Sequence, residues 1–261
     1  MRRDNVFWGG LLVLLGLLFL LQAQGLLRAD VFRYFWPLFL ILLGGWIILG
    51  VYWRPASQSD ETFSIPLGGA RQAGLKFSNG VGQVEITGGA PAGQLLVGPS
   101  ARGMNHSSHL VGDKLEAKVE AGPSFAPFVG PASGIWRFQL TQEVPLTLRI
   151  EAGANQLNVD LKDVLATYIQ LKTGASSTHL TLPARGASLL DVEAGMASID
   201  IRLPEGVAGR IRVKEGATAL NVDMNRFPRL EGGIYQSVDF DKAENRAEVN
   251  LEAGFGAVTI K

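Results

Sequence analysis

The sequence predicts a two-helix transmembrane hairpin at the N-terminus, followed by an all-β domain of stacked strand-turn-strand units, a β-solenoid-like fold. Three observations carry this prediction. Two long uncharged apolar runs lie before Ala56. One short phrase recurs four times at a fixed period of ~21 residues. Within each copy apolar and polar residues alternate, as in strands with one buried face.

The two apolar runs are each long enough to cross a bilayer as a helix. Residues 6–27 and 34–53 contain no charged side chain, and about 20 apolar residues span the hydrocarbon core. The intervening RADVFR is too short for anything except a tight reversal. We therefore expect a membrane hairpin at residues 1–55, a linker at 56–61 and a repetitive all-β domain at 62–261.

A cleaved signal peptide is the competing interpretation of the first run, because Arg2 and Arg3 precede it and LQAQG follows it. The run is long for a signal peptide, the cleavage pattern is poor, and a second spanning segment follows at once. These features favour the hairpin.

A hairpin places both of its ends on one side of the membrane. Arg2, Arg3 and Arg54 lie on that side, whereas Arg28 and Arg33 lie in the loop. The positive-inside rule then places the β domain in the cytoplasm by a margin of one arginine.

Composition excludes several kinds of function. The chain has no cysteine, which excludes disulfides, thiolate zinc sites and a cysteine nucleophile. Residues 1–55 carry five arginines against two aspartates, so the neutral chain has a net charge of −3 in its remainder. A mildly acidic body argues against a nucleic-acid partner, which needs a basic surface.

The four copies of the phrase align without a gap over residues 147–227. The aligned positions include Leu148, Ile169, Leu190 and Ile211 before the turn, Leu157, Thr178, Ile199 and Leu220 after it, and Gly153, Gly174, Gly195 and Gly216 at the turn. Each unit therefore reads strand, glycine turn, strand, loop, and we expect the glycines to supply a positive φ. The ungapped period favours stacked units over the alternative, an antiparallel β-sandwich, whose loops vary in length.

Further copies lie outside this block. Leu75–Ile86 fits the same columns, and Val119–Ser124 keeps only the first half of the phrase. Leu251–Lys261 also fits and ends the chain in mid-unit, so the clearest repeats cover 147–227 and 247–261. A terminal rung left open would offer unpaired backbone groups to another chain.

The outward column of the repeats alternates in charge. Glu151, Lys172, Glu193 and Lys214 would lie one above another in a parallel stack, about 4.8 Å apart. This alternation supports stacking, since like charges at that spacing would repel.

Two regions resemble known bacterial families. The stretches RRDNVFWGGLLVLLGLLFLL and FRYFWPLFLILLGGWIILG resemble the transmembrane region shared by LiaI- and LiaF-type proteins, through the Trp-Gly-Leu-Leu opening and the Trp-Pro-Leu second segment. PLGGARQAGLKFSNGVGQVEITGG resembles the opening of toastrack-type β domains and LiaF C-terminal domains. The resemblance implies a role in cell-envelope stress, often by restraining a sensor kinase, and brings no catalytic residues with it.

The sequence offers little chemistry. His106 and His109 have a spacing that fits a metal, but the segment reads as a loop and has no third ligand at an obvious spacing. His179 is expected on the outward side of a strand. The acidic side chains are scattered and balanced by basic ones rather than clustered as in a solenoid glycosidase. We expect no catalytic residue, no metal and no cofactor.

The loop from Gly122 to Trp136 interrupts the repeats and is rich in proline and aromatic residues. It is either a cap over the core or an exposed partner contact made by Phe125, Phe128 and Trp136.

The sequence therefore predicts a membrane-anchored, non-catalytic, LiaF-like protein of envelope-stress regulation, a multi-pass protein of the cell membrane. Its expected partners are the lipid bilayer, through residues 6–53, and a protein such as a sensor kinase, with no nucleic acid. A cell-surface adhesin or wall-binding module and a self-assembling membrane-attached β-scaffold are the alternatives.

Overall fold

The computed structural model describes residues 62–100, 103–122, 134–214 and 217–261, together with residue 40. The chain divides into two units, Met1–Pro55 and Ala56–Lys261. The expected helix at 6–27, nearly all of the one at 34–53 and the linker at 56–61 lie outside the described residues.

Within the described part of the chain, no helix is long and apolar enough to span a bilayer.

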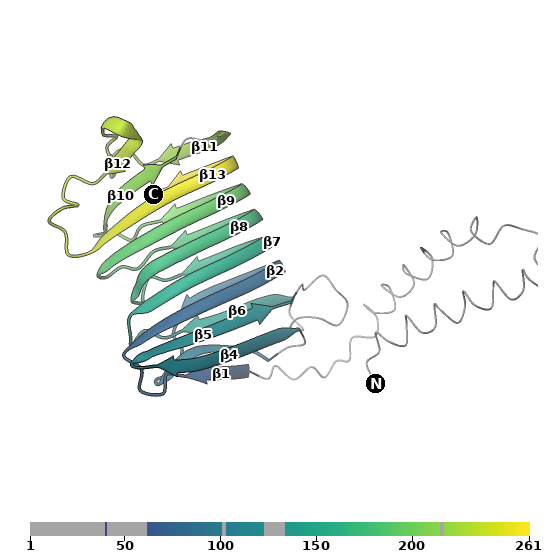
Figure 1. Ribbon diagram of the computed structural model, residues 1–261. Helices are drawn as coiled ribbons and strands as arrows, with labels where there is room; N and C mark the ends of the chain where they lie inside the picture. The colour runs from purple at the N-terminus through teal and green to yellow at the C-terminus, as the bar shows by residue number, and fades with distance from the viewer. Residues whose placement is uncertain (1–39, 41–61, 101–102, 123–133, 215–216) are drawn as a thin grey trace, which may run out of the picture. The chain divides into compact units, whose positions relative to one another are not determined.

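The second unit is built almost entirely of strands (Figure 1). Its described residues form one sheet in the order β1-β3-β6-β2-β7-β8-β9-β13-β10-β12, from which β4, β5 and β11 branch. The strands are β1 Thr62–Pro66, β2 Gln72–Gly88, β3 Gln94–Pro99, β4 Met104–Val111, β5 Lys114–Ala121, β6 Ile135–Leu140, β7 Leu146–Asp160, β8 Ala166–Thr181, β9 Ala187–Arg202, β10 Ala208–Val213, β11 Ala217–Val222, β12 Ile234–Gln236 and β13 Arg246–Ile260, and a 3₁₀ turn, η1, covers Glu231–Gly233.

Five long strands form the centre of the sheet and lie side by side as parallel rungs: β2, β7, β8, β9 and β13 (Figure 1). Leu148 lies opposite Ile169, and Ile169 lies opposite Leu190. These partners are one repeat apart in the sequence, so the predicted period is the spacing between rungs. Parallel pairing of consecutive units agrees with the predicted stack and not with a sandwich of antiparallel hairpins.

Each long strand must fold back on itself at its middle. A straight strand of 15 residues such as β7 would span about 48 Å. Leu146, at the start of β7, pairs with Ala166, at the start of β8. The short connection between β7 and β8 can bridge only about 21 Å. The chain therefore turns near Gly153, and each rung has a first arm and a returning arm.

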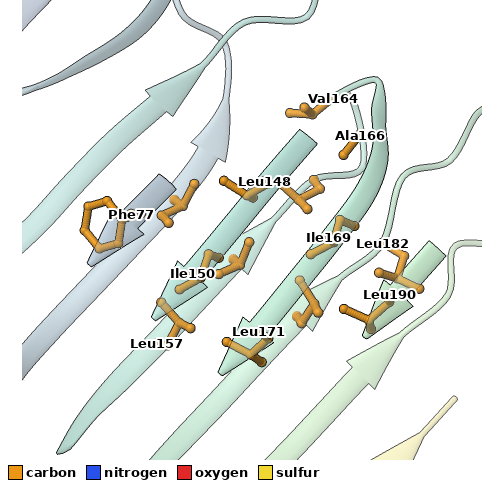
Figure 2. Close-up of a cluster of buried hydrophobic side chains, with 14 of the residues drawn as sticks. Phe77, Leu148, Ile150, Leu157, Val164, Ala166, Ile169, Leu171, Leu182 and Leu190 are labelled. Atoms are coloured by element: carbon orange, nitrogen blue, oxygen red, sulfur yellow. The ribbon is translucent and has the colours of Figure 1, made fainter. Parts of the chain in front are cut away.

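The core lies between the two arms. On β7 the buried side chains fall at 146, 148, 150 and 152 before the turn and at 157 and 159 after it, which is the change of phase expected when the strand folds back. Figure 2 shows Leu148 and Ile150 of one rung beside Ile169 and Leu171 of the next. Burial of each such aliphatic side chain contributes about 1.5–3 kcal/mol to the stability of the fold. A single rung cannot bury these side chains by itself, and the neighbouring rungs of the stack cover them.

The partial copies of the repeat also form rungs. Phe77 lies opposite Ile150, so Leu75–Ile86 stacks in register as predicted. Val119 on β5 lies opposite Phe77, and β6 supplies the missing second half, where Trp136 lies opposite Val84. One rung is thus shared by β5 and β6.

The last strand is not the last rung. Leu251 on β13 lies opposite Val192 on one side and Val213 on the other, so β13 is inserted between β9 and the pair β10 and β11. The prediction of an open terminal rung is therefore wrong, because both edges of β13 are paired.

The ends of the stack are closed differently. At one end β4 and β1 are the outermost strands (Figure 1), and the ring of His106 stacks on Phe63 with centroids 4.3 Å apart. At the other end Phe227 is fully buried. Arg226 beside it donates hydrogen bonds to the carbonyl oxygens of Leu203 and Pro204, at 2.7 and 3.0 Å.

Candidate functional site

The turn between the two arms forms a continuous edge of the stack, here called the glycine edge. Its glycines are Gly80, Gly153, Gly174, Gly195 and Gly254. None of them has the positive φ that the sequence predicted, and Gly216 lies outside the described residues. That part of the prediction is wrong.

Glycine is required at this edge because neighbouring turns come very close together. A Cβ on Gly153 would lie 2.3 Å from the carbonyl oxygen of Gly80. A Cβ on Gly195 would lie 3.0 Å from the carbonyl oxygen of Gly174, and one on Gly254 would lie 2.9 Å from that of Gly195. The turns at Gly153, Gly195 and Gly254 thus leave little or no room for a methyl group beside the carbonyl of the neighbouring turn, the close approach that glycine permits.

A shallow groove of ≈ 960 Å³ follows the glycine edge. Its floor is made of the glycines and of small side chains such as Ala152 and Ala194. One wall carries Glu151, Lys172 and Glu193 on successive strands. This wall is the charged column that the sequence predicted, but its composition differs at one position.

The insertion of β13 places Glu252 between Glu193 and Lys214. Glu193 lies opposite Glu252 in the register of β9 and β13, so the predicted alternation of charge is broken there. Each carboxylate instead binds a lysine on its other side: Lys172 contacts Glu193 at 2.7 Å, and Lys214 contacts Glu252 at 2.7 Å. Pairing within the column offsets the one like-charge contact.

The pKa shifts agree with this pairing. The hydrogen bond from Lys76 to Glu151 is the main cause that holds the pKa of the Glu151 carboxyl below its usual value, and the hydrogen bond from Lys214 lowers the pKa of Glu252. The hydrogen bond to Glu193 raises the pKa of Lys172. These carboxylates are held ionised, whereas a general acid needs a raised pKa.

The opposite side of the glycine edge is apolar. The residue after each edge glycine projects outward, and neighbouring strands bring these residues together in register. This apolar ridge consists of Val81, Ala154, Ala175, Met196 and Phe255.

Two side chains of the apolar ridge stand out. Met196 and Phe255 lie opposite each other on β9 and β13, and they are 67% and 64% exposed. Large apolar side chains that remain this exposed side by side mark an interaction surface more often than isolated ones do. The sequence contains the signal, since an apolar residue follows each of these glycines, but the alternation of apolar residues does not indicate that this position is exposed.

The predicted contact residues fall into two groups. Phe125 and Phe128 lie in residues 123–133, outside the described residues, so their role stays a prediction. Trp136 lies on β6 and is fully buried, next to Val84. Its interpretation as an exposed contact is therefore corrected: it fills the core, as the capping alternative required, and its Nε1 has no partner in the described structure.

The histidines do not form a metal site. His106 and His109 lie on strand β4, not in a loop as predicted, and residues three apart on a strand point to opposite faces. No group of three metal-binding side chains occurs among the described residues. His179 is exposed on β8, as predicted.

Comparison with known proteins gives two family matches. Residues 54–202 match the family model described as the N-terminal domain of toast_rack, DUF2154. Residues 6–48 match the LiaI-LiaF-like transmembrane region. No curated protein matches the chain.

Two solved structures are similar in fold. A candidate cell adhesion protein from Clostridium sporogenes ATCC 15579 has a TM-score of 0.66 and 21% identity, over 77% of this chain and 97% of that one. A candidate adhesin from Bacteroides fragilis NCTC 9343 has a TM-score of 0.27 and 10% identity, over 78% and 98% of the two chains. At these identities the first likeness concerns the fold alone.

Proposed function

The chain belongs to the family of the toast_rack N-terminal domain, and from that premise we propose a membrane-attached, non-catalytic regulator that acts by protein contacts in bacterial cell-envelope stress. The match of residues 6–48 to the LiaI-LiaF-like transmembrane region supports attachment to the membrane. The LiaF-like part of the proposal is that the β unit restrains a sensor kinase in the same membrane.

The observation that carries this proposal is the apolar ridge. Its two largest side chains, Met196 and Phe255, leave apolar surface in water next to a groove of ≈ 960 Å³. Burying them against a partner would contribute about 25 cal/mol for each Å² removed from water. The ridge is narrow, so it suits a partner already confined to the same membrane, for which the cost of association is reduced.

The charged wall fits a protein contact better than catalysis. Its carboxylates form ion pairs with lysines at 2.6–2.7 Å, so opposite charges offset one another along the wall. Exposed pairs of this kind contribute little to affinity, but they favour partners with matching charges.

A stress-responsive reporter in the native host tests the proposal. Deletion of the gene should raise the reporter without stress, because a restraint on the kinase is lost. Met196→Ser combined with Phe255→Ser should reproduce much of that rise while the protein remains in the membrane at normal amount. The matched control is Ser198→Ala with Thr259→Ser, on the same two strands, and it should leave the reporter unchanged.

If the reporter responds to neither the deletion nor the double variant, the protein does not regulate the envelope-stress response. A reporter that responds to the deletion but not to the double variant would keep the pathway and exclude the ridge.

The side of the membrane separates this function from the alternative of an adhesin or wall-binding module. We propose a cytoplasmic β unit, on the margin of one arginine in the positive-inside count. Ser198→Cys provides the sole thiol in a chain without cysteine, at an exposed position of β9. Labelling by a membrane-impermeant thiol reagent only after lysis is the expected result; labelling of intact cells would favour the adhesin.

A further inference from the structure

Strand β4 is an open edge of the sheet. It spans Met104–Val111, and among the described strands it pairs with β5 alone. No hydrogen bond joins its other side to any part of the described chain. Seven of its eight residues are exposed, and they include Leu110 and Val111 at 52% and 60%. An edge of this length presents a row of backbone donors and acceptors to any strand that can approach it.

The usual protections of an edge strand are missing from β4. Its sequence, MNHSSHLV, contains no lysine, arginine, aspartate, glutamate or proline, the residues that prevent an edge from pairing. The other outer strands are shorter: β12 has three residues, β1 has five and ends at Pro66, and β11, which pairs with β13 alone among the described strands, has six. β4 is thus the edge of this sheet best suited to accept another strand.

We propose that β4 pairs with β4 of a second copy of this chain, in antiparallel orientation, and so joins two sheets into one. An unprotected edge is a template for a second copy of itself, and charge does not oppose that pairing. In a self-paired edge, residues of one β4 lie opposite residues of the other β4. Since β4 contains no Lys, Arg, Asp or Glu, no register places two such like charges opposite each other. A two-fold contact of this type is closed and stops at the dimer.

The inference is independent of the proposed regulatory function. It concerns the end of the stack formed by β4 and β1, whereas the apolar ridge follows the glycine edge. Either one can fail without the other.

The symmetry makes a sharp geometric prediction. Residues opposite each other in an antiparallel pair share a face of the sheet. Around a two-fold axis this condition requires one residue of β4 to lie opposite its own copy, with Cα atoms about 4.5–5.5 Å apart. Its neighbours are displaced from their own copies by about 6.8 Å along the strand, which takes them beyond the ~7 Å limit for a disulfide.

A cysteine scan of β4 in the full chain tests the proposal, since the natural chain has no cysteine. Single cysteines replace each residue from Asn105 to Leu110, and Ser198→Cys on the outer face of β9 is the control. Membranes from cells that express each variant are oxidised, and disulfide dimers are measured on non-reducing gels. One position should dominate, and its two neighbours and Ser198 should give little dimer.

Added charge on the edge provides the second variant. Ser107→Lys with Ser108→Lys, or whichever one of them leaves the best-crosslinking cysteine in place, should lower the dimer yield of that cysteine about tenfold, because like charges of the two copies are then brought together at the edge. The same pair of changes at Ser177 and Ser198 is the matched control and should leave the yield unchanged. All four serines are exposed. Ser177 and Ser198 lie opposite each other on β8 and β9, so the control also contains a like-charge contact, but within one chain.

Three outcomes contradict the proposal. In one, no position of β4 exceeds the Ser198 control. In another, all positions crosslink equally, which indicates random collisions. In the third, the lysine pair at 107 and 108 has no more effect than the pair at 177 and 198.

Discussion

Gly80 and Gly153 occupy the same place in neighbouring rungs, yet an added methyl group meets different surroundings at each. At Gly153 it would lie 2.3 Å from a backbone carbonyl oxygen, whereas at Gly80 no atom of the described residues lies within 4 Å. The difference arises because the rung before β2 is interrupted at its turn, between β5 and β6. The stack therefore requires glycine at one position and tolerates a larger residue at the other.

We predict that Gly153→Ala destabilises the β unit by about 1–3 kcal/mol, because the backbone must shift to relieve the contact. Gly80→Ala is the matched control and should change the free energy of unfolding by less than ~1 kcal/mol. The free energy of unfolding of the β unit in both variants is measured with the purified full chain, by urea unfolding monitored through pulse proteolysis. If both substitutions lower the free energy of unfolding equally, the backbone conformation, and not the lack of room for a methyl group, is the reason for glycine at these positions.

At the scale of the strand, the sequence predicted the register well. The fixed period places each residue beside its counterpart, because a slip of one residue would turn every apolar side chain outward. Periodicity could not reveal the position of β13. The phrase at Leu251–Lys261 carries the same columns as the other rungs, so it could pair with any of them. The position of β13 in the sheet depends on the path of the chain segments that connect it to the earlier strands.

A deletion tests the independence of the rungs. Removal of Thr167–Ala187 takes out one full repeat and joins equivalent positions of β8 and β9. We expect this shorter chain to fold with cooperative unfolding and reduced stability, as in other stacked repeats. Removal of Thr167–Ser176, about half a repeat, should prevent folding, since the returning arm would then start at the wrong edge. Circular dichroism and protease resistance distinguish the two; a folded half-repeat deletion would contradict the stack.

Acid should weaken the charged column. The pKa of Glu151 is lowered in the fold, mainly by its hydrogen bond with Lys76, so its stabilisation is present above the ordinary value of 4.5 and is lost as the pH falls through the folded pKa. The side chains are 41% and 44% exposed, so solvent screening keeps the effect below ~1 kcal/mol.

Glu151→Gln should therefore make the free energy of unfolding less dependent on pH below 4.5, and added salt should reduce the difference. Glu205→Gln removes an exposed carboxylate that has no ion pair in the described structure, and it serves as the control. If the two variants give the same pH profile, the Lys76–Glu151 pair does not contribute to stability.

At the scale of the whole molecule, the sequence predicted the kind of protein better than its surface. The two family matches agree with the resemblances read from the hairpin and from the glycine turns. The apolar ridge was missed because exposure depends on which side of the folded strand faces outward. The alternation of inward and outward residues is interrupted at the glycine, so the sequence pattern does not carry across the turn. Trp136 was misread because its loop could cover the core or leave it, and sequence alone does not distinguish the two.

Site-specific photocrosslinking in native membranes tests the central claim, that this chain acts by a protein contact at the apolar ridge. A photoreactive amino acid replaces Met196 or Phe255, with Ser198 and Ala257, two residues further along the same strands, as controls. The account predicts a discrete adduct from the two ridge positions alone, and mass spectrometry should identify its partner as a membrane-bound sensor kinase. Adducts that form equally at the control positions, or only with lipid, would contradict it.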